Sequence, residues 1–257
     1  MSTGRFVWYE LMTSDPKAAI AFYSEVAGWK TQPFTEATGP EPYTMWVGTQ
    51  GPLGGVMTLP AEAKKMGAPP HWFSHVSVDD VDATVAKVKQ LGGKVHVPPT
   101  PIPKVGRFSV IADPQGATLS VFKPDQPMEA HDTTKQGEFN WNELLTTDHE
   151  NAFAFYSALF GWQKISEFDM GPMGKYWLYG QGDKQYGGMM TKTADMPMPP
   201  TWIYYIQVDD LDAAVTRSTS KGAKVMHGPV DVPGGTRIAQ LTDPQGAVFA
   251  LHGPGKK

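Results

Sequence analysis

Apolar residues along the chain fall into short runs that glycine, proline and polar residues interrupt. The run over residues 6–11 has the composition of a strand. The next apolar residues follow at steps of three and four, which is the spacing of a helix: Ala19, Phe22, Tyr23 and Val26. Strands are then expected near 29–35, 43–49 and 54–59. The pattern predicts a strand, a helix and three strands.

The same order follows a second time. A strand is expected over 72–78, and the next helix has its inward residues at helical spacing, namely Val81, Val85 and Val88. Three more strands are expected near 94–97, 107–112 and 117–122. Residues 98–101, Pro-Pro-Thr-Pro, are interpreted as a rigid turn. Short polar side chains are suitable caps for the two helices, at Ser14 or Asp15 and at Asp79 or Asp80.

The second half of the chain repeats the first. Residues 139–163 match 6–30 at an offset of 133, with 13 of 25 positions identical. Residues 207–225 match 77–95 at an offset of 130, and 242–254 match 112–124 at the same offset. A duplicated unit of about 130 residues has the size of one domain. The chain therefore predicts four strand–helix–three-strand modules, two in each half.

The segment between the copies is polar and carries no apolar period. We interpret 125–138 as an exposed linker between a first domain over 1–124 and a second over 139–257.

Composition and charge argue against several classes of function. The chain has 257 residues, 40% of them hydrophobic, and a net charge of −4, so neither a nucleic-acid partner nor an anionic membrane is expected. No stretch approaches the roughly 20 apolar residues of a membrane span, and no signal peptide is recognised. The chain has no cysteine, which excludes disulfides, thiolate metal sites and a cysteine nucleophile. A cytoplasmic protein is expected.

Several motifs resemble those of the vicinal oxygen chelate superfamily, which includes glyoxalase I, bleomycin-resistance proteins and extradiol dioxygenases. They are D-x-x-x-A-x-x-F-Y from Asp15, G-W at 28–29, V-D-D-x-D-A over 78–83 and D-P-x-G over 113–116, with counterparts in the second half. The tandem form is similar to two-domain glyoxalase-like proteins of actinobacterial type. The resemblance implies an α+β fold, in which paired βαβββ modules form an incomplete barrel around a small-molecule cavity.

The resemblance also assigns divalent-metal ligands to fixed strand positions. In this chain those positions hold, in the first half, Trp8, Met57, Phe73 and Ser120 and, in the second half, Trp141, Met190, Ile203 and Ala250. Divalent ions of this kind are bound by carboxylate or imidazole groups, which none of the eight offers. We therefore expect no tightly bound metal or other cofactor, although a divalent metal remains the alternative.

Side chains alternate across a strand, so further residues are expected on the same faces. Glu10 follows Trp8, Glu143 follows Trp141, His75 follows Phe73 and Tyr205 follows Ile203. The predicted ligand-binding set is Trp8, Phe73, His75, Ser120, Trp141, Tyr205 and His252. His75 and His252 are also weighed as shifted metal ligands beside the glutamates.

Glu10 and Glu143 are the catalytic candidates. In one interpretation each is a carboxylate in a partly apolar cavity that accepts a proton or anchors a ligand. In the other, each is a structural acid paired with backbone N–H groups or with an arginine such as Arg107 or Arg237. Both interpretations stay open at this point.

Six tryptophans also have a functional and a structural interpretation. Residues 8, 46, 72, 141, 177 and 202 are all tryptophan and either stack on a flat ligand or pack in the core. The leading hypothesis is a metal-free protein that binds a small organic molecule. The alternatives are a metal-dependent lyase of the lactoylglutathione lyase type, acting on a 2-oxoaldehyde adduct in detoxification, and a non-catalytic interaction protein. A homodimer is also considered.

Overall fold

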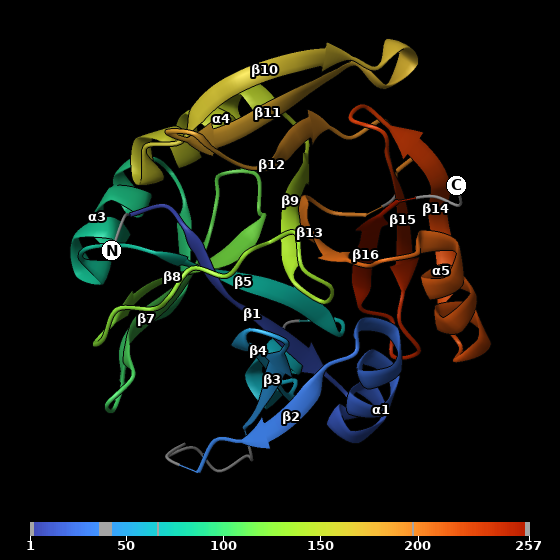
Figure 1. Ribbon diagram of the computed structural model, residues 1–257. Coiled ribbons are helices and arrows are strands. Elements are labelled where there is room, and N and C mark those ends of the chain that lie inside the picture. Colours follow the sequence, from blue (N-terminus) through green and yellow to red (C-terminus); the bar gives the residue numbers. More distant parts are fainter. Residues whose placement is uncertain (1–2, 36–42, 66, 197, 255–257) are drawn as a thin grey trace. The chain divides into compact units, whose positions relative to one another are not determined.

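Four βαβββ modules make up the chain in the computed structural model, which describes residues 3–35, 43–65, 67–196 and 198–254 (Figure 1). The first module contains β1 (Phe6–Thr13), α1 (Pro16–Ala27), β2 (Lys30–Pro33), β3 (Thr44–Gly48) and β4 (Gly51–Thr58). After α2 (Ala61–Lys65), the second module contains β5 (His71–Ser77), α3 (Val81–Gln90), β6 (Lys94–Ile102), β7 (Gly106–Ala112) and β8 (Thr118–Pro124).

The second half repeats these elements. The third module contains β9 (Phe139–Thr146), α4 (His149–Phe160), β10 (Gln163–Asp169), a 3₁₀ turn η1 (Gly171–Met173), β11 (Lys175–Gln181) and β12 (Lys184–Thr191). The fourth contains β13 (Thr201–Gln207), α5 (Leu211–Ser220), β14 (Lys224–Val232), β15 (Thr236–Thr242) and β16 (Val248–Gly253). The predicted α+β fold of paired modules is confirmed.

Each half supplies one mixed sheet of eight strands. The strand orders are β2-β3-β4-β1-β5-β8-β7-β6 and β10-β11-β12-β9-β13-β16-β15-β14. Within each module the first and last strands pair in parallel, and the three later strands pair antiparallel in succession. The helix that follows the first strand is the crossover that such parallel pairing requires.

Aspartates begin the module helices. The side chain of Asp15 accepts a hydrogen bond from the Ala18 backbone N–H, and Asp80 does the same for Ala83. The alternatives Ser14 and Asp79 are therefore not the caps. No helix in the described part of the chain is both long and apolar enough to cross a membrane.

One expectation for a connecting segment was wrong. The run over 98–101 is not a turn but part of β6, which lies at the edge of its sheet with register shifts between Val95 and Thr100. An edge strand with irregular pairing tolerates proline because the missing N–H faces no partner. The segment that connects β4 to β5 contains the short helix α2, none of whose residues is buried.

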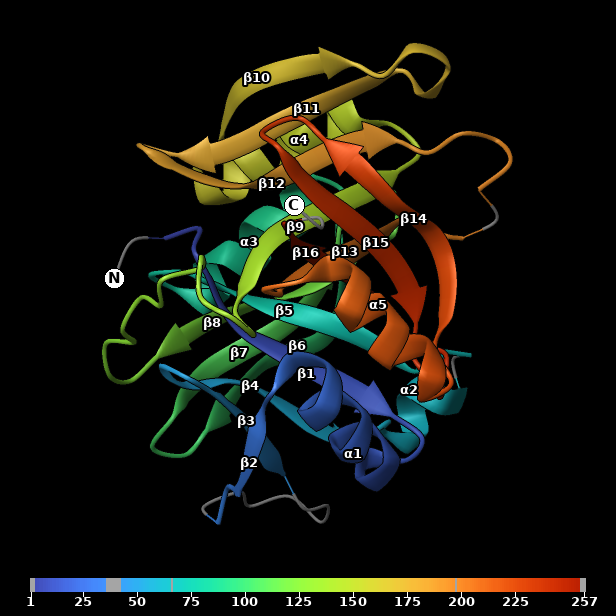
Figure 2. The same ribbon diagram turned by 45° about the vertical axis from the view of Figure 1, so that its right-hand side comes forward.

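The chain divides into two compact units that each take one module from either half. The first unit comprises residues 1–7, 73–130 and 141–203, so it joins the second and third modules. The second unit comprises residues 8–72, 131–140 and 204–257, so it joins the first and fourth modules. Helix α3 packs against α4 in the first unit and α1 against α5 in the second (Figures 1 and 2). The domain division at 125–138 stays a prediction.

A buried tyrosine–aspartate hydrogen bond closes each unit. In the second unit, Tyr23 Oη on α1 donates to Asp243 Oδ2 at 3.1 Å, and Trp72 Nε1 donates to the same tyrosine oxygen at 2.8 Å. The first unit repeats this arrangement with Trp202, Tyr156 and Asp113. Each aspartate opens a D-P-Q-G turn, so a helix of one half is bonded to a turn of the other.

Aromatic rings fill the space around these bonds. In the second unit they are Tyr23, Trp29, Trp46, Trp72, Phe139 and Phe249, and in the first Phe6, Tyr156, Phe160, Trp162, Tyr179 and Trp202. Two indoles donate to backbone carbonyls at 2.7 Å, Trp29 to Gly137 and Trp162 to Gly4. These contacts satisfy the polar ends of the rings, as buried tryptophan requires.

Removing a central hydroxyl should destabilise the chain. We expect Tyr23→Phe and Tyr156→Phe each to lower the free energy of unfolding by about 1–3 kcal/mol, because an indole N–H and a buried carboxylate lose their shared partner. Urea unfolding measures the change. Tyr186→Phe, at a half-buried tyrosine outside these bonds, is the control and should change the free energy less.

The same aspartates should make stability depend on pH. Burial raises the pKa of Asp113 and of Asp243 above the ordinary 3.8, although hydrogen bonds from backbone N–H groups and from the tyrosines oppose the shift. The folded chain then binds protons that the unfolded chain has released, so these groups cost stability as pH rises through the raised pKa. We expect the wild type to gain stability relative to Asp113→Asn and Asp243→Asn as pH falls from 7 towards 3.8. Urea titrations at several pH values test this, and a constant difference would contradict it.

Candidate functional site

Glu10 and Glu143 lie in the middle of β1 and β9, each with only 7% of its surface exposed. Each follows a half-buried tryptophan by two residues and so shares that tryptophan's side of its strand. The structure therefore brings together Trp8 with Glu10 in the second unit and Trp141 with Glu143 in the first.

A tyrosine links the tryptophan and the glutamate in the third module. Trp141 Nε1 on β9 donates to Tyr176 Oη on β11 at 2.9 Å. Tyr176 Oη in turn donates to Glu143 Oε2 at 2.8 Å. The three side chains thus form one chain of hydrogen bonds that is contained within a single module.

The first module repeats the arrangement at the same offset of 133 residues. Trp8 Nε1 donates to Tyr43 Oη at 2.7 Å. Burial raises the pKa of Tyr43 well above its usual range, the negative charge of Glu10 raises it further, and the bond from Trp8 partly opposes both. The Tyr43 hydroxyl therefore keeps its proton at neutral pH, beside the carboxylate of Glu10.

Two glycines make room for these tyrosines. A side chain at Gly55 would overlap the hydroxyl end of the Tyr43 ring, and one at Gly188 would overlap the Tyr176 ring. These glycines lie inside β4 and β12. A register shift beside each glycine pair leaves Leu53 of β4 and Tyr186 of β12 without a partner residue on the adjacent strand. Glycine is needed here because another part of the chain approaches closely.

The arginine alternative for the glutamates was wrong. Arg107 is bonded to Asp82 at 2.8 and 3.0 Å. Arg237 is bonded to Asp212 at 2.8 and 2.9 Å and lies 3.4 Å from Asp231. Both arginines therefore bind aspartates of their own module, near the start of its helix.

In the second module, His75 lies among aromatic rings. It faces Phe73 at 5.2 Å, Phe122 at 5.8 Å and Phe108 at 6.3 Å between ring centroids. Ser120 is its partner across the β5–β8 pair, and Ser120 Oγ donates to the Ser109 carbonyl at 3.1 Å. The predicted residues Phe73, His75 and Ser120 are thus together on one side of the second module, in the first unit.

The corresponding side of the fourth module is polar. His252 Nδ1 accepts from Asn140 Nδ2 at 2.5 Å, and its Nε2 meets Thr236 Oγ1 at 2.8 Å. Burial lowers the pKa of His252, so the ring is neutral at pH 7. Tyr205 Oη accepts from Gln240 Nε2 at 2.8 Å. Tyr205 and His252 therefore belong to hydrogen-bonded networks of the second unit.

The six tryptophans considered above have three kinds of environment. Three of them, Trp46, Trp72 and Trp202, are at most 6% exposed and pack in the aromatic cores, as the packing interpretation expected. Trp177 packs against His149, with Lys164 Nζ 3.7 Å from its ring centroid, a cation–π contact. Trp8 and Trp141 are the ones beside the glutamates.

The eight positions to which the resemblance assigns metal ligands do not fit a divalent ion. Their side chains are indole, thioether, phenyl, hydroxyl and alkyl groups, which are poor ligands for such an ion. Within the described ranges, no three His, Asp or Glu side chains gather closely enough to hold a metal.

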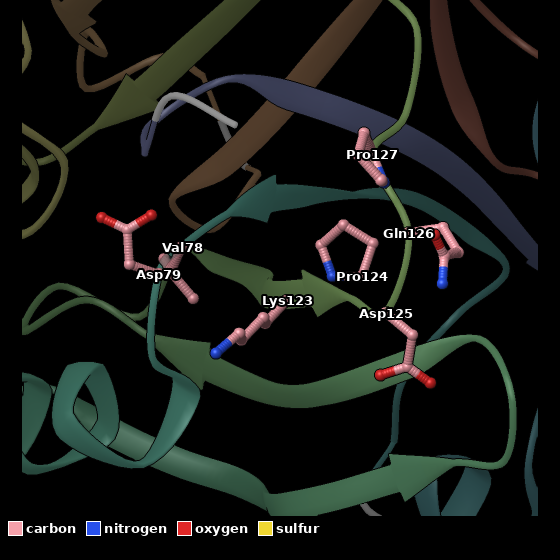
Figure 3. Close-up of a pocket in the computed structure, with 7 residues that line it drawn as sticks. All are labelled: Val78, Asp79, Lys123, Pro124, Asp125, Gln126 and Pro127. Atoms are coloured by element: carbon pink, nitrogen blue, oxygen red, sulfur yellow. The ribbon is translucent and has the colours of Figure 1, made fainter.

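A separate pocket of about 330 Å³ opens where β8 leaves the first sheet (Figure 3). Charged and proline side chains surround it: Val78, Asp79, Lys123, Pro124, Asp125, Gln126 and Pro127. None of the predicted site residues lines it. We therefore do not place the site there.

Sequence reasoning missed Tyr43 and Tyr176. Each lies 33 residues after its glutamate, so no local spacing links the two side chains. A signal was nevertheless present, because the tyrosine, the paired glycines and the W-x-E motif all recur at the same offset of 133. This joint recurrence is the signal from which the set could have been selected.

Comparison with known proteins matches both halves of the chain to one family. The model of the "Glyoxalase/Bleomycin resistance protein/Dioxygenase superfamily" matches residues 5–121 and again 138–251. The chain is 35% identical over 250 residues to "Putative glyoxylase CFP32" of Mycobacterium tuberculosis, covering 96% of this chain and 94% of that protein. It is 29% identical over 258 residues to "Anthracycline biosynthesis protein DauV" of a Streptomyces species, covering 96% and 92%.

Solved structures show the same fold at low identity. A Mn(II)-bound glyoxalase from Novosphingobium aromaticivorans superposes with a TM-score of 0.66 at 15% identity, covering 98% of this chain and 82% of that one. Homoprotocatechuate 2,3-dioxygenase from Brevibacterium fuscum gives 0.69 at 11%, covering 98% and 80%.

The close approach of glycine and tyrosine gives a test. We expect Gly188→Ala to displace the Tyr176 ring and to lower the free energy of unfolding by about 1–3 kcal/mol, because the added methyl overpacks the site. With Tyr176→Ala the methyl has room, so the double variant should lose less than the sum of the single losses. Combined with Tyr43→Ala, in the other module, Gly188→Ala should be additive. Urea unfolding of all variants measures these losses. If Gly188→Ala were additive with Tyr176→Ala as well as with Tyr43→Ala, the packing of Tyr176 over Gly188 would be contradicted.

Proposed function

The chain belongs to the Glyoxalase/Bleomycin resistance protein/Dioxygenase superfamily, and from that premise we propose that it binds a small organic molecule beside Glu10 and Glu143 without a tightly held metal. The observation that carries the proposal is the repeated tryptophan–tyrosine–glutamate arrangement, in which a buried carboxylate lies next to an indole in each half. Aromatic surface with a few fixed polar groups is the usual composition of a small-molecule site.

Each glutamate serves as a proton acceptor or as an anchor for the ligand. An ionised carboxylate has only acceptor oxygens, and it lies here with 7% of the residue exposed, where competing water is scarce. A ligand O–H or N–H bonds to such a group, and an acidic C–H gives up its proton to it. The ligand-binding residues Phe73, His75, Ser120, Tyr205 and His252 remain predictions, as do a homodimer and a cytoplasmic location.

A metal-dependent glyoxalase-type lyase is the second candidate. The observation in its favour is the 35% identity to a protein whose name contains the word glyoxylase. Against it stands the chemistry of the eight side chains at the family's ligand positions. We therefore derive no step through a metal.

A thermal-shift screen of small organic molecules, run with and without added nickel, zinc or manganese, tests the proposal. We expect some compounds to raise the melting temperature without metal, since a ligand that binds only the native state stabilises it. Glu10→Gln and Glu143→Gln should each weaken the shift, and the double variant should lose it. Asp125→Asn, at an exposed aspartate that belongs to neither tryptophan–tyrosine–glutamate arrangement, is the matched control.

Metal analysis of the purified chain tests the metal-dependent alternative. About one metal ion per half, together with 2-oxoaldehyde turnover that a chelator abolishes, would overturn the metal-free proposal and favour the lyase.

A further inference from the structure

We infer that Tyr43 and Tyr176 are positioning residues, each of which holds its neighbouring glutamate as a hydrogen-bond acceptor for a ligand group that brings its own proton. The inference rests on the function proposed above and specifies the ligand chemistry of both copies. It assigns the tyrosines no contact with the ligand.

The indole fixes the direction of the hydrogen bonds. Trp141 Nε1–H is a donor only, so the Tyr176 oxygen must accept it. A phenolic hydroxyl has a single proton, and with Glu143 Oε2 at 2.8 Å that proton points to the carboxylate. Tyr176 thus has no proton left for a ligand, and the group that meets the ligand is the carboxylate.

The first copy supports the same assignment. The Tyr43 oxygen accepts from Trp8 Nε1 at 2.7 Å, so its proton is likewise free to turn towards a second partner. The Glu10 charge acts on this hydroxyl strongly enough to be the largest cause, after burial, of its raised pKa. We infer that this proton is directed to the Glu10 carboxylate, as it is to Glu143 in the second copy.

Packing holds each tyrosine in place. The rings lie over Gly55 and Gly188, where a side chain would displace them. Tyr43 directly precedes β3 and Tyr176 lies in β11, so each approaches its glutamate from another segment of the same module. A carboxylate whose hydrogen bonds are set before the ligand arrives loses less freedom on binding. The predicted ligand class is therefore a small molecule with a hydroxyl, amine or acidic C–H group at the point of contact.

The indole N–H resonances in a ¹H–¹⁵N spectrum of the unliganded chain test this inference. The chain has 8 tryptophans, and the variants Trp8→Phe and Trp141→Phe identify the two resonances of interest. We expect Tyr176→Phe to shift the Trp141 resonance upfield and to leave Trp8 unchanged. Tyr43→Phe should do the reverse, so each copy is the matched control for the other.

A pH titration separates positioning from mere packing. When Glu143 gains its proton in acid, the Tyr176 hydroxyl responds and the Trp141 indole resonance should move with it. This movement should persist in Tyr43→Phe and be lost in Tyr176→Phe and in Glu143→Gln. If the tyrosine only filled space, protonation of the carboxylate would not change the indole resonance through it.

An indole resonance that ignores pH in the wild type, or that still follows it in Tyr176→Phe, would overturn the inference. Should Tyr176→Phe fail to fold, all eight indole resonances would lose their dispersion, and Glu143→Gln then gives the same answer. No ligand enters the experiment. Its failure is thus distinct from failure of the thermal-shift screen, which tests binding alone.

Discussion

The hydrogen bond from a helix tyrosine to the aspartate of a D-P-Q-G turn is the constraint on which the two units depend. Tyr23 and Asp243 are separated by 220 residues, and Tyr156 and Asp113 by 43, yet both bonds are 3.1 Å long and buried. Burying a carboxylate is costly, and backbone N–H groups of the turn together with the tyrosine hydroxyl offset that cost. The geometry therefore exists only when modules from both halves are present, which explains why neither half forms a unit by itself.

The same order of groups, an indole, a phenol and a carboxylate, occurs at two kinds of place in the protein. In the core its carboxylate is an aspartate whose other oxygen is occupied by backbone N–H groups, and the arrangement has nothing left to offer a ligand. On the strands the carboxylate is a glutamate, one methylene longer, at the centre of β1 or β9. The first version joins modules from the two halves, whereas the second lies within a single module.

Much of the fold was predictable because local rules and tertiary packing agree. The strand–helix–three-strand order follows from apolar periodicity, and Asp15 and Asp80 cap their helices as short polar residues do. The prolines of β6 misled because edge position, which a single sequence does not reveal, removes the penalty that proline carries in a strand. Glu10 and Glu143 could be chosen from alternation along one strand. Tyr43 and Tyr176 could not, because their contacts join segments 33 residues apart and depend on glycines that admit their rings.

The interleaving of modules has a consequence for biosynthesis. A ribosome completes the second module before it begins the third, and it completes the first module long before the fourth. The first unit cannot close until the chain has been made as far as residue 203, and the second must wait for β16. Until then the aromatic surfaces of the early modules have no partner module on the same polypeptide. Nascent chains are thus exposed to pairing with one another, and covalent fusion of the two halves limits that hazard by keeping the correct mate only one linker away.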